Sequence, residues 1–169
     1  MNVAGIINDS IVDGPGLRFT IFVQGCPHNC PGCHNPETHD YNKKCKEYSV
    51  DELFDMIKSN PLLDGVTFSG GDPFSEQHVE ELIALAKRIK NETKLNLLIY
   101  TGYTLEEIIV KWNKSFLDLM DLADYLVDGP FIQEKKSLDC KFRGSTNQRF
   151  FDLNKGELLY ENEKTEHQS

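Results

Sequence analysis

Hydrophobic and polar positions along the chain follow two periodicities in turn, which predict alternating strands and helices. Apolar residues recur at helical spacing (i, i+3, i+4, i+7) in three segments that begin after Ser49, Ser75 and Thr104. Ser49 with Glu52, and Thr104 with Glu107, form the capping-box pattern of a helix start. Four short runs rich in β-branched and aromatic residues predict strands that end at Gly or Asp-Gly. These runs are Leu17–Val23, Val66–Ser69, Leu95–Thr101 and Ala123–Val127.

This alternation is typical of βαβ units, so we expect an α/β fold with a mainly parallel sheet. A closed eight-stranded barrel needs about 250 residues, and the chain has 169. We therefore expect a partial (open) βα barrel of about four to six strands, with its site at the carboxyl ends of the strands.

The chain shows no repeat and no linker, which predicts one domain over residues 1–160. Phe150–Leu153 and Glu157–Tyr160 flank Asn154-Lys155-Gly156 and predict a terminal hairpin. Residues 161–169 are polar and predict a disordered tail.

Composition and charge restrict the partners. Hydrophobic residues make up 39% of the chain, enough to build a core. Eighteen basic and twenty-seven acidic residues give a net charge of −9, which disfavours nucleic acid and anionic lipid as partners. The apolar runs are too short to cross a bilayer, and the first residues do not resemble a secretory signal. We expect a cytoplasmic protein.

Three of the five cysteines, Cys26, Cys30 and Cys33, fall within eight residues directly after the first predicted strand. In a reducing compartment such a group favours metal binding over disulfides. A four-iron cluster normally takes four cysteine ligands. Three thiolates at C-x3-C-x2-C spacing would therefore leave one iron open to a substrate.

Structural zinc is the alternative interpretation of this loop. Its fourth ligand would be His28, His34, Cys45 or Cys140. Zinc sites more often use two separated ligand pairs, and the sequence shows no second pair. The spacing thus favours iron and sulfur. Cys45 and Cys140 are expected to be small, partly buried hydrophobic residues.

The cysteine spacing resembles the signature of radical S-adenosylmethionine (SAM) enzymes. The segment Phe68-Ser69-Gly70-Gly71-Asp72-Pro73, which closes the second predicted strand, is similar to the Gly-Gly segment that binds the methionine amino group in that family. Two departures occur: Asp72 stands where many members carry Glu, and Gly32 stands where an aromatic residue often precedes the third cysteine.

Six segments in order resemble one subfamily over nearly the whole chain, the glycyl-radical activases of anaerobic ribonucleoside-triphosphate reductase. They are GPGLR, GCPHNCPGCHN, SGGDP, YTGY, VDGPF and RGSTNQR. The resemblance implies a [4Fe–4S] cluster that reductively cleaves SAM, and a 5′-deoxyadenosyl radical that takes hydrogen from a glycine of the large reductase subunit. It also implies a flavodoxin or ferredoxin-type electron donor.

Site residues follow from this resemblance. The implied cluster ligands are Cys26, Cys30 and Cys33, and the implied SAM-binding residues are Gly32, Cys33, His34, Gly70, Gly71, Asp72 and Thr101. On this interpretation Gly71→Val weakens SAM binding while the cluster still forms. Asp128 is either a polar contact in the site or the start of a turn. The segment 143–149 lines a docking groove, touches SAM or forms a solvated loop.

Other functions stay open at this point. The chain could activate a different glycyl-radical enzyme, or convert a small molecule as 7-carboxy-7-deazaguanine synthases do. Outside radical chemistry, the loop could belong to a non-catalytic zinc-binding module or to a simple electron carrier. Iron content distinguishes the zinc module, and SAM cleavage distinguishes the carrier.

Overall fold

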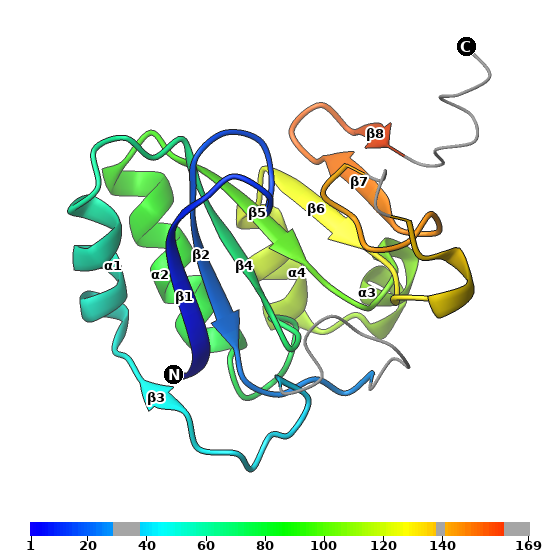
Figure 1. The fold of residues 1–169 in the computed structure, drawn as a ribbon, viewed down its shortest axis with the longest axis horizontal. Helices are drawn as coiled ribbons and strands as arrows, with labels where there is room; N and C mark the ends of the chain where they lie inside the picture. The colour runs from blue at the N-terminus through cyan, green and yellow to red at the C-terminus, as the bar shows by residue number, and fades with distance from the viewer. Residues whose placement is uncertain (29–37, 138–140, 161–169) are drawn as a thin grey trace.

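A computed structural model describes residues 1–28, 38–137 and 141–160 of the protein. The described residues form one eight-stranded sheet with the order β3-β1-β2-β4-β5-β6-β7-β8 (Figure 1). The strands are β1 (Asn2–Ser10), β2 (Arg18–Val23), β3 (Lys46–Glu47), β4 (Gly65–Gly70), β5 (Asn96–Tyr100), β6 (Tyr125–Asp128), β7 (Arg149–Asp152) and β8 (Glu157–Tyr160). The helices are α1 (Val50–Lys58), α2 (Val79–Glu92), α3 (Leu105–Lys111) and α4 (Lys114–Leu122), with a short 3-10 turn at Gln133–Lys135.

The α/β class is confirmed, but the sheet is mixed rather than mainly parallel. Its central strands β2, β4, β5 and β6 are parallel neighbours. At one edge of the sheet, β1 pairs antiparallel with β2, and β3 pairs antiparallel with β1. At the other edge, β7 pairs antiparallel with β6, and β8 pairs antiparallel with β7. Helical crossovers join the parallel strands, whereas short connections between β1 and β2 and between β7 and β8 produce hairpins. The predicted terminal hairpin is β7–β8.

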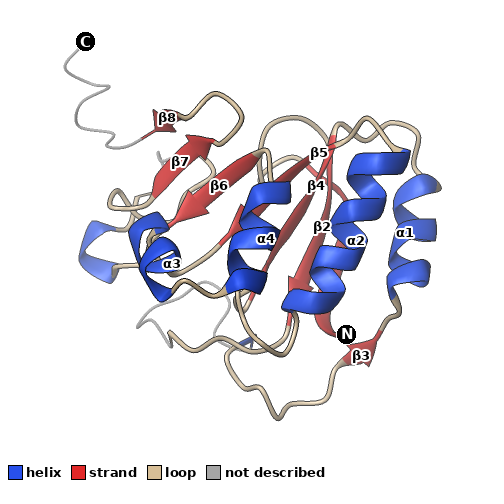
Figure 2. Ribbon diagram, turned by 180° about the vertical axis from the view of Figure 1, so that it is seen from behind, coloured by secondary structure: helices blue, strands red, loops and turns tan. Residues whose placement is uncertain are grey.

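All four helices lie against one face of the sheet (Figure 2). The main core fills the space between them, with side chains such as Phe19, Ile21 and Leu82 fully buried. A smaller apolar cluster of Leu98, Val127 and Phe150 packs on the opposite face. No helix of the described residues covers that face, which Figure 1 shows in front. One face of the sheet is therefore covered by helices, whereas the other packs a smaller apolar cluster beneath loops of the chain.

A buried arginine braces the segment that precedes β2. Arg18 is fully buried, and its guanidinium donates to the Thr67 hydroxyl at 2.7 Å and to the Pro15 and Val66 carbonyls at 2.9 Å. Burial lowers the pKa of Arg18 to about 10, so it still carries its charge at neutral pH. The Thr67 hydroxyl donates in turn to the Asp13 carbonyl at 2.8 Å. The GPGLR segment is thus held against β4.

Candidate functional site

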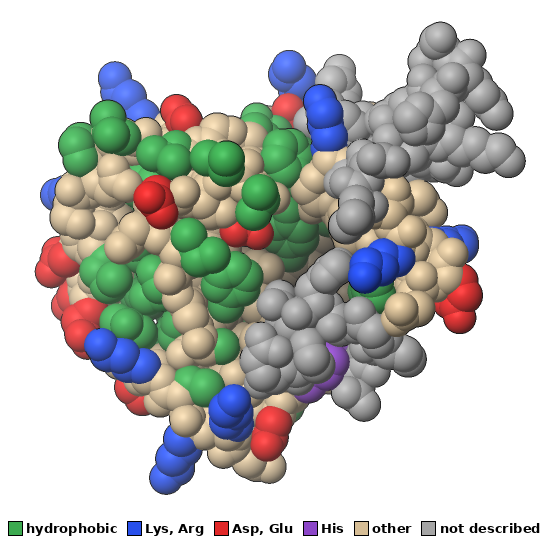
Figure 3. All heavy atoms as spheres, viewed as in Figure 1, with side chains coloured by type: hydrophobic (Ala, Val, Ile, Leu, Met, Phe, Trp, Pro, Cys, Tyr) green, Lys and Arg blue, Asp and Glu red, His purple; other side chains and the backbone are tan. Residues whose placement is uncertain are grey.

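A cavity of about 690 Å³ opens at the carboxyl ends of the central parallel strands, on the helix-free side of the sheet. Its lining combines the segment after β2 with the ends of β4 and β5 and with residues beyond β6. Figure 3 shows this face of the molecule, with hydrophobic side chains spread over it. Phe22, Phe131 and Phe142 give the cavity an apolar wall. The position agrees with the site expected from the βαβ pattern.

The described start of the cysteine loop (residues 25–28 of the segment 25–35) leads from β2 into a short paired stem, formed by Gly25, Cys26, Thr38 and His39. The Gly25 amide donates to the Thr38 carbonyl at 2.6 Å, and the Cys26 amide donates to the His39 carbonyl at 3.2 Å. Cys26 is half-buried and lines the cavity. The stem therefore fixes the backbone of the first predicted ligand.

Several predicted residues lie outside the described part of the chain. These are Cys30, Cys33, Gly32, His34 and Cys140. Within the described part, no group of three or more His, Cys, Asp or Glu side chains is arranged to hold a metal ion. The ligand set Cys26, Cys30 and Cys33 thus stays a prediction, of which the structure places Cys26.

The Gly-Gly turn after β4 packs directly on the stem. The Gly71 amide donates to the Val23 carbonyl, and the Asp72 amide donates to the Gly25 carbonyl, both at 2.8 Å. A Cβ on Gly71 would lie 2.0 Å from the Gly25 carbonyl oxygen, a distance that atoms cannot adopt without movement of the backbone. Gly70 has φ +109° and would place a Cβ 2.3 Å from the Val23 nitrogen. Both glycines line the cavity, but packing against β2 and the stem already requires them.

Asp72 is a buried hydrogen-bond acceptor that joins three segments. Its side chain is fully buried and is not among the residues that line the cavity. One carboxylate oxygen accepts from the Phe74 amide at 2.9 Å. The other accepts from the Thr101 hydroxyl at 3.0 Å, the Gly102 amide at 2.9 Å and the His28 Nε2–H at 2.6 Å. In this arrangement Asp72 organises the site, and a contact with SAM stays a prediction. Thr101, by contrast, lines the cavity.

Two tyrosines contact the described start of the cysteine loop: Tyr41, which the sequence did not single out, lies against Gly25, and Tyr103 of the YTGY segment lies against His28. Burial, with smaller effects of Asp72 and Cys26, raises the pKa of Tyr41 to about 12. Burial likewise raises the pKa of Tyr103, again with Asp72 and Cys26 contributing. Both phenols therefore stay protonated at neutral pH and do not serve as bases. Gly25 accommodates Tyr41, because a Cβ there would lie 2.2 Å from the Tyr41 ring.

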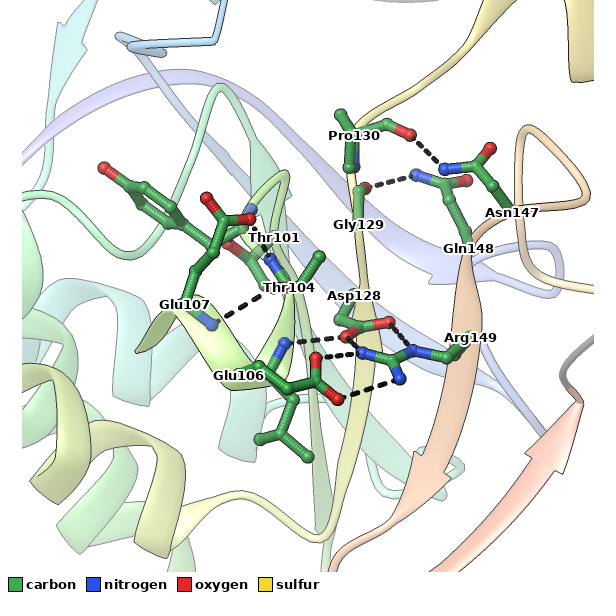
Figure 4. Close-up of polar contacts among 12 residues, drawn as sticks. Thr101, Thr104, Glu106, Glu107, Asp128, Gly129, Pro130, Asn147, Gln148 and Arg149 are labelled. Carbon is green, nitrogen blue, oxygen red and sulfur yellow. Dashed lines mark hydrogen bonds and ion pairs between the residues drawn. The ribbon is translucent and has the colours of Figure 1, made fainter. Parts of the chain in front are cut away.

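The opposite wall of the cavity is held by an ion-pair network (Figure 4). Arg149 donates to Asp128 from β6 and to both carboxylate oxygens of Glu106 from α3. Asp128 also accepts from the Leu105 amide at 2.7 Å, which caps the start of α3. Pairing with these two carboxylates raises the pKa of Arg149, so the guanidinium stays charged. Asp128 is thus a polar contact between elements, not a cavity-lining residue.

The segment 143–149 forms part of this wall, and its interpretation as a solvated loop is wrong. Arg143 is 5% exposed and Ser145 is fully buried. The Gln148 side chain donates to the Gly129 carbonyl at 2.9 Å and accepts from the Gly144 amide at 2.8 Å. The bond to Gly129, shown in Figure 4, joins the segment to the residue after β6, and the bond from Gly144 lies within the segment. Arg143, Gly144 and Gln148 also line the cavity, and the roles in a docking groove or in SAM contact stay predictions.

We expect Arg149→Met to destabilise the protein by on the order of 3 kcal/mol, because it leaves the buried Asp128 carboxylate without its cationic partner. The Asp128 side chain is 1% exposed, whereas that of Glu106 is 62% exposed. Glu106→Gln should therefore cost less than about 1 kcal/mol. Urea unfolding of the two variants measures the difference. Equal losses of unfolding free energy would contradict this reading of the network.

No helix of the described residues is long and apolar enough to cross a membrane.

A family model described as a 4Fe-4S single cluster domain matches residues 12–151. The Salmonella typhimurium anaerobic ribonucleoside-triphosphate reductase-activating protein is 39% identical to this chain over 142 residues, which cover 82% of this chain and 90% of the relative. The Escherichia coli K12 protein of the same name is 38% identical over 146 residues, with the same coverage.

A protein of that name from phage T4 is 32% identical over 163 residues, covering 92% of this chain and 97% of its own. Among solved structures, QueE from Escherichia coli aligns over 59% of this chain and 49% of the QueE chain, with a TM-score of 0.43 and 19% identity. That structural likeness is too low for a conclusion about fold or function.

Proposed function

Since the chain belongs to the family of anaerobic ribonucleoside-triphosphate reductase-activating proteins, we propose that it is the radical SAM activase of such a reductase. Its product is a glycyl radical on the large reductase subunit. The observation that carries the proposal is the junction of the cysteine loop with the Gly-Gly turn at one cavity, where Cys26, Gly70 and Gly71 meet.

The residues at this junction fit a cluster and a bound cofactor. Cys26 supplies one thiolate at the cavity wall, and Cys30 and Cys33 of the same loop supply the other two. Gly70 and Gly71 pack against β2 and the stem and also border the cavity, so their backbone atoms lie beside a bound ligand. The cavity volume of about 690 Å³ lies within the range of small-molecule sites.

When bound, the cluster supplies the electron for reductive cleavage of SAM at the iron that lacks a cysteine ligand. The chain's own residues bind and orient the reactants. Gly32, Cys33 and His34 of the cysteine loop would contact bound SAM, and Thr101 offers a hydroxyl in the cavity. The aromatic wall formed by Phe22, Phe131 and Phe142 excludes water from the reaction. Asp72 fixes the loop and the strand end that carry these groups.

The cavity on the helix-free side of the sheet suits a protein substrate. A helix-free face leaves room for a peptide segment of the reductase to reach the cavity, and we propose that the sheet curves as a partial barrel around it. The large reductase subunit is then the partner. The electron comes from a flavodoxin or ferredoxin-type protein in a cytoplasmic setting.

Electron paramagnetic resonance tests the function directly. The reduced, cluster-loaded protein is mixed with SAM and the large subunit of the reductase. We expect a doublet glycyl-radical signal that requires both SAM and the cluster, together with release of methionine. A protein that cleaves SAM only in the presence of a small-molecule substrate, and forms no radical on the reductase, would contradict the proposal.

A further inference from the structure

We propose that His28 is a positioning residue that holds the cysteine loop in a socket at the ends of β4 and β5, and that it is not an iron ligand. The assignment rests on the proposed function, because it takes the cysteine loop to bind the cluster. The socket consists of Asp72, Gly102 and Tyr103. Sequence alone offered His28 only as a hydrogen-bonding residue of the loop or as a zinc ligand.

The contacts of the imidazole define the socket. His28 Nε2 lies 2.6 Å from Asp72 Oδ2 and must carry the hydrogen, because a carboxylate accepts. The ring meets the Tyr103 ring edge to face, with centroids 4.4 Å apart and an interplanar angle of 78°. Only 16% of the side chain is exposed. One ring nitrogen is therefore engaged by Asp72 and is not available to a metal.

Gly102 provides the space for this ring. A Cβ at position 102 would lie 2.4 Å from His28 Cδ2 and 2.8 Å from Nε2. Neither distance is compatible with a real side chain unless the ring moves. The glycine in the Tyr100-Thr101-Gly102-Tyr103 segment is thus explained by close approach of the loop, without any ligand.

The carboxylate of the socket is oriented independently of His28. Asp72 also accepts from the Phe74 amide at 2.9 Å, the Gly102 amide at 2.9 Å and the Thr101 hydroxyl at 3.0 Å. Because these three donors belong to the segments that follow β4 and β5, the acceptor is oriented without any contribution from His28. A fixed acceptor of this kind orients the group that binds it.

Cys26 is consequently held from two sides. On one side its amide is paired with the His39 carbonyl in the stem, and two residues later His28 is anchored in the socket. A cluster ligand needs such support, since residues that orient metal ligands typically change metal affinity by about 10- to 100-fold when they are lost. The geometry thus assigns His28 to the support of Cys26.

The test compares cluster retention in three variants of the full chain after anaerobic reconstitution. His28→Ala removes the ring. Gly102→Ala displaces the ring and leaves His28 itself intact. His28→Gln restores an amide donor near the position of Nε2. Gly5→Ala is the matched glycine control, because a Cβ there meets no atom within 4 Å.

The readouts are the rate of iron loss to a chelator, the change of the cluster spectrum on addition of SAM, and the thermal midpoint. We expect His28→Ala and Gly102→Ala to lose iron about 10- to 100-fold faster than wild type, with a weakened response to SAM. His28→Gln and Gly5→Ala should stay close to wild type in the rate of iron loss and in the spectral response to SAM. A merely structural role of His28 would lower the thermal midpoint without this difference in iron loss.

Two results would overturn the assignment while the wild-type protein still binds a cluster. If His28→Ala and Gly102→Ala both lose iron at the wild-type rate, His28 does not position the loop. Loss of the cluster from His28→Gln as complete as from Cys26→Ala would make His28 a ligand. A wild-type protein that binds no cluster would instead refute the proposed function.

Discussion

Gly71→Val is expected to abolish cluster retention and SAM binding together. A Cβ at position 71 would lie 2.0 Å from the Gly25 carbonyl oxygen and 2.9 Å from the Thr38 carbonyl oxygen, and valine adds two methyl groups. The stem must then separate from the Gly-Gly turn, and the hydrogen bond from the Asp72 amide to the Gly25 carbonyl is lost. Because Cys26 follows Gly25 directly, its position changes with the stem.

Iron content after reconstitution and equilibrium binding of SAM measure the two effects. We expect retained iron to fall at least about tenfold, the lower end of the effect of losing ligand support. Gly5→Val serves as the control, since the space around Gly5 is open. A Gly71→Val protein with full iron content and only weakened SAM binding would show that the turn meets the cofactor without supporting the loop, as the sequence alone suggested.

Substitution of any one of the three clustered cysteines is expected to abolish both the cluster and SAM cleavage. A four-iron cluster with only three cysteine ligands has no further cysteine to replace a lost one, because the fourth iron binds SAM and not a protein thiolate. The variants are Cys26→Ala, Cys30→Ala and Cys33→Ala. Iron analysis, the visible absorption of the cluster and release of methionine from SAM measure the loss.

Cys45→Ala and Cys140→Ala are the controls for this series, and we expect near wild-type iron and cleavage. The Cys45 thiol lies 3.4 Å from the Gln24 side-chain oxygen and donates a weak hydrogen bond there. This contact gives Cys45 a hydrogen-bonding role beside the stem, and we expect that it is not a cluster ligand. Loss of the cluster in either control would show that four cysteines bind it, and the open iron would be excluded.

Most of the central fold was predictable because the relevant signals are local. The capping boxes at Ser49 and Thr104 both form, and the helices begin where these residues indicate. The central strands and the terminal hairpin also occur close to the predicted positions. Hydrophobic periodicity and capping depend on residues within about one or two turns of each other, so one sequence is sufficient to identify them.

The peripheral elements were not predictable in the same way. β1 and β3 were missed, because their antiparallel pairing is set by the neighbouring strands and not by an apolar run. α4 was also missed, because it follows α3 after only two residues, Trp112 and Asn113. Trp112 ends α3 in a left-handed conformation with φ 52°, and Asn113 then caps the next helix.

The candidate site was predictable in composition and not in its connections. The cysteine and glycine motifs indicate the chemistry, and the described members of both line one cavity. The pairing of His28 with Asp72 joins residues 44 positions apart, and that of Arg149 with Glu106 joins residues 43 apart. Such contacts depend on the packing of whole strands, and no local pattern specifies them. Tyr41, whose ring packs against Gly25, carried no sequence signal at all.

Mössbauer spectroscopy of the 57Fe-loaded protein tests the central claim most directly. One iron of the cluster should differ from the other three, and only its spectrum should shift when SAM is added. The same single-site shift is expected for Cys140→Ala. Four irons that do not respond to SAM, or a reconstituted protein that contains zinc and no iron, would contradict the account.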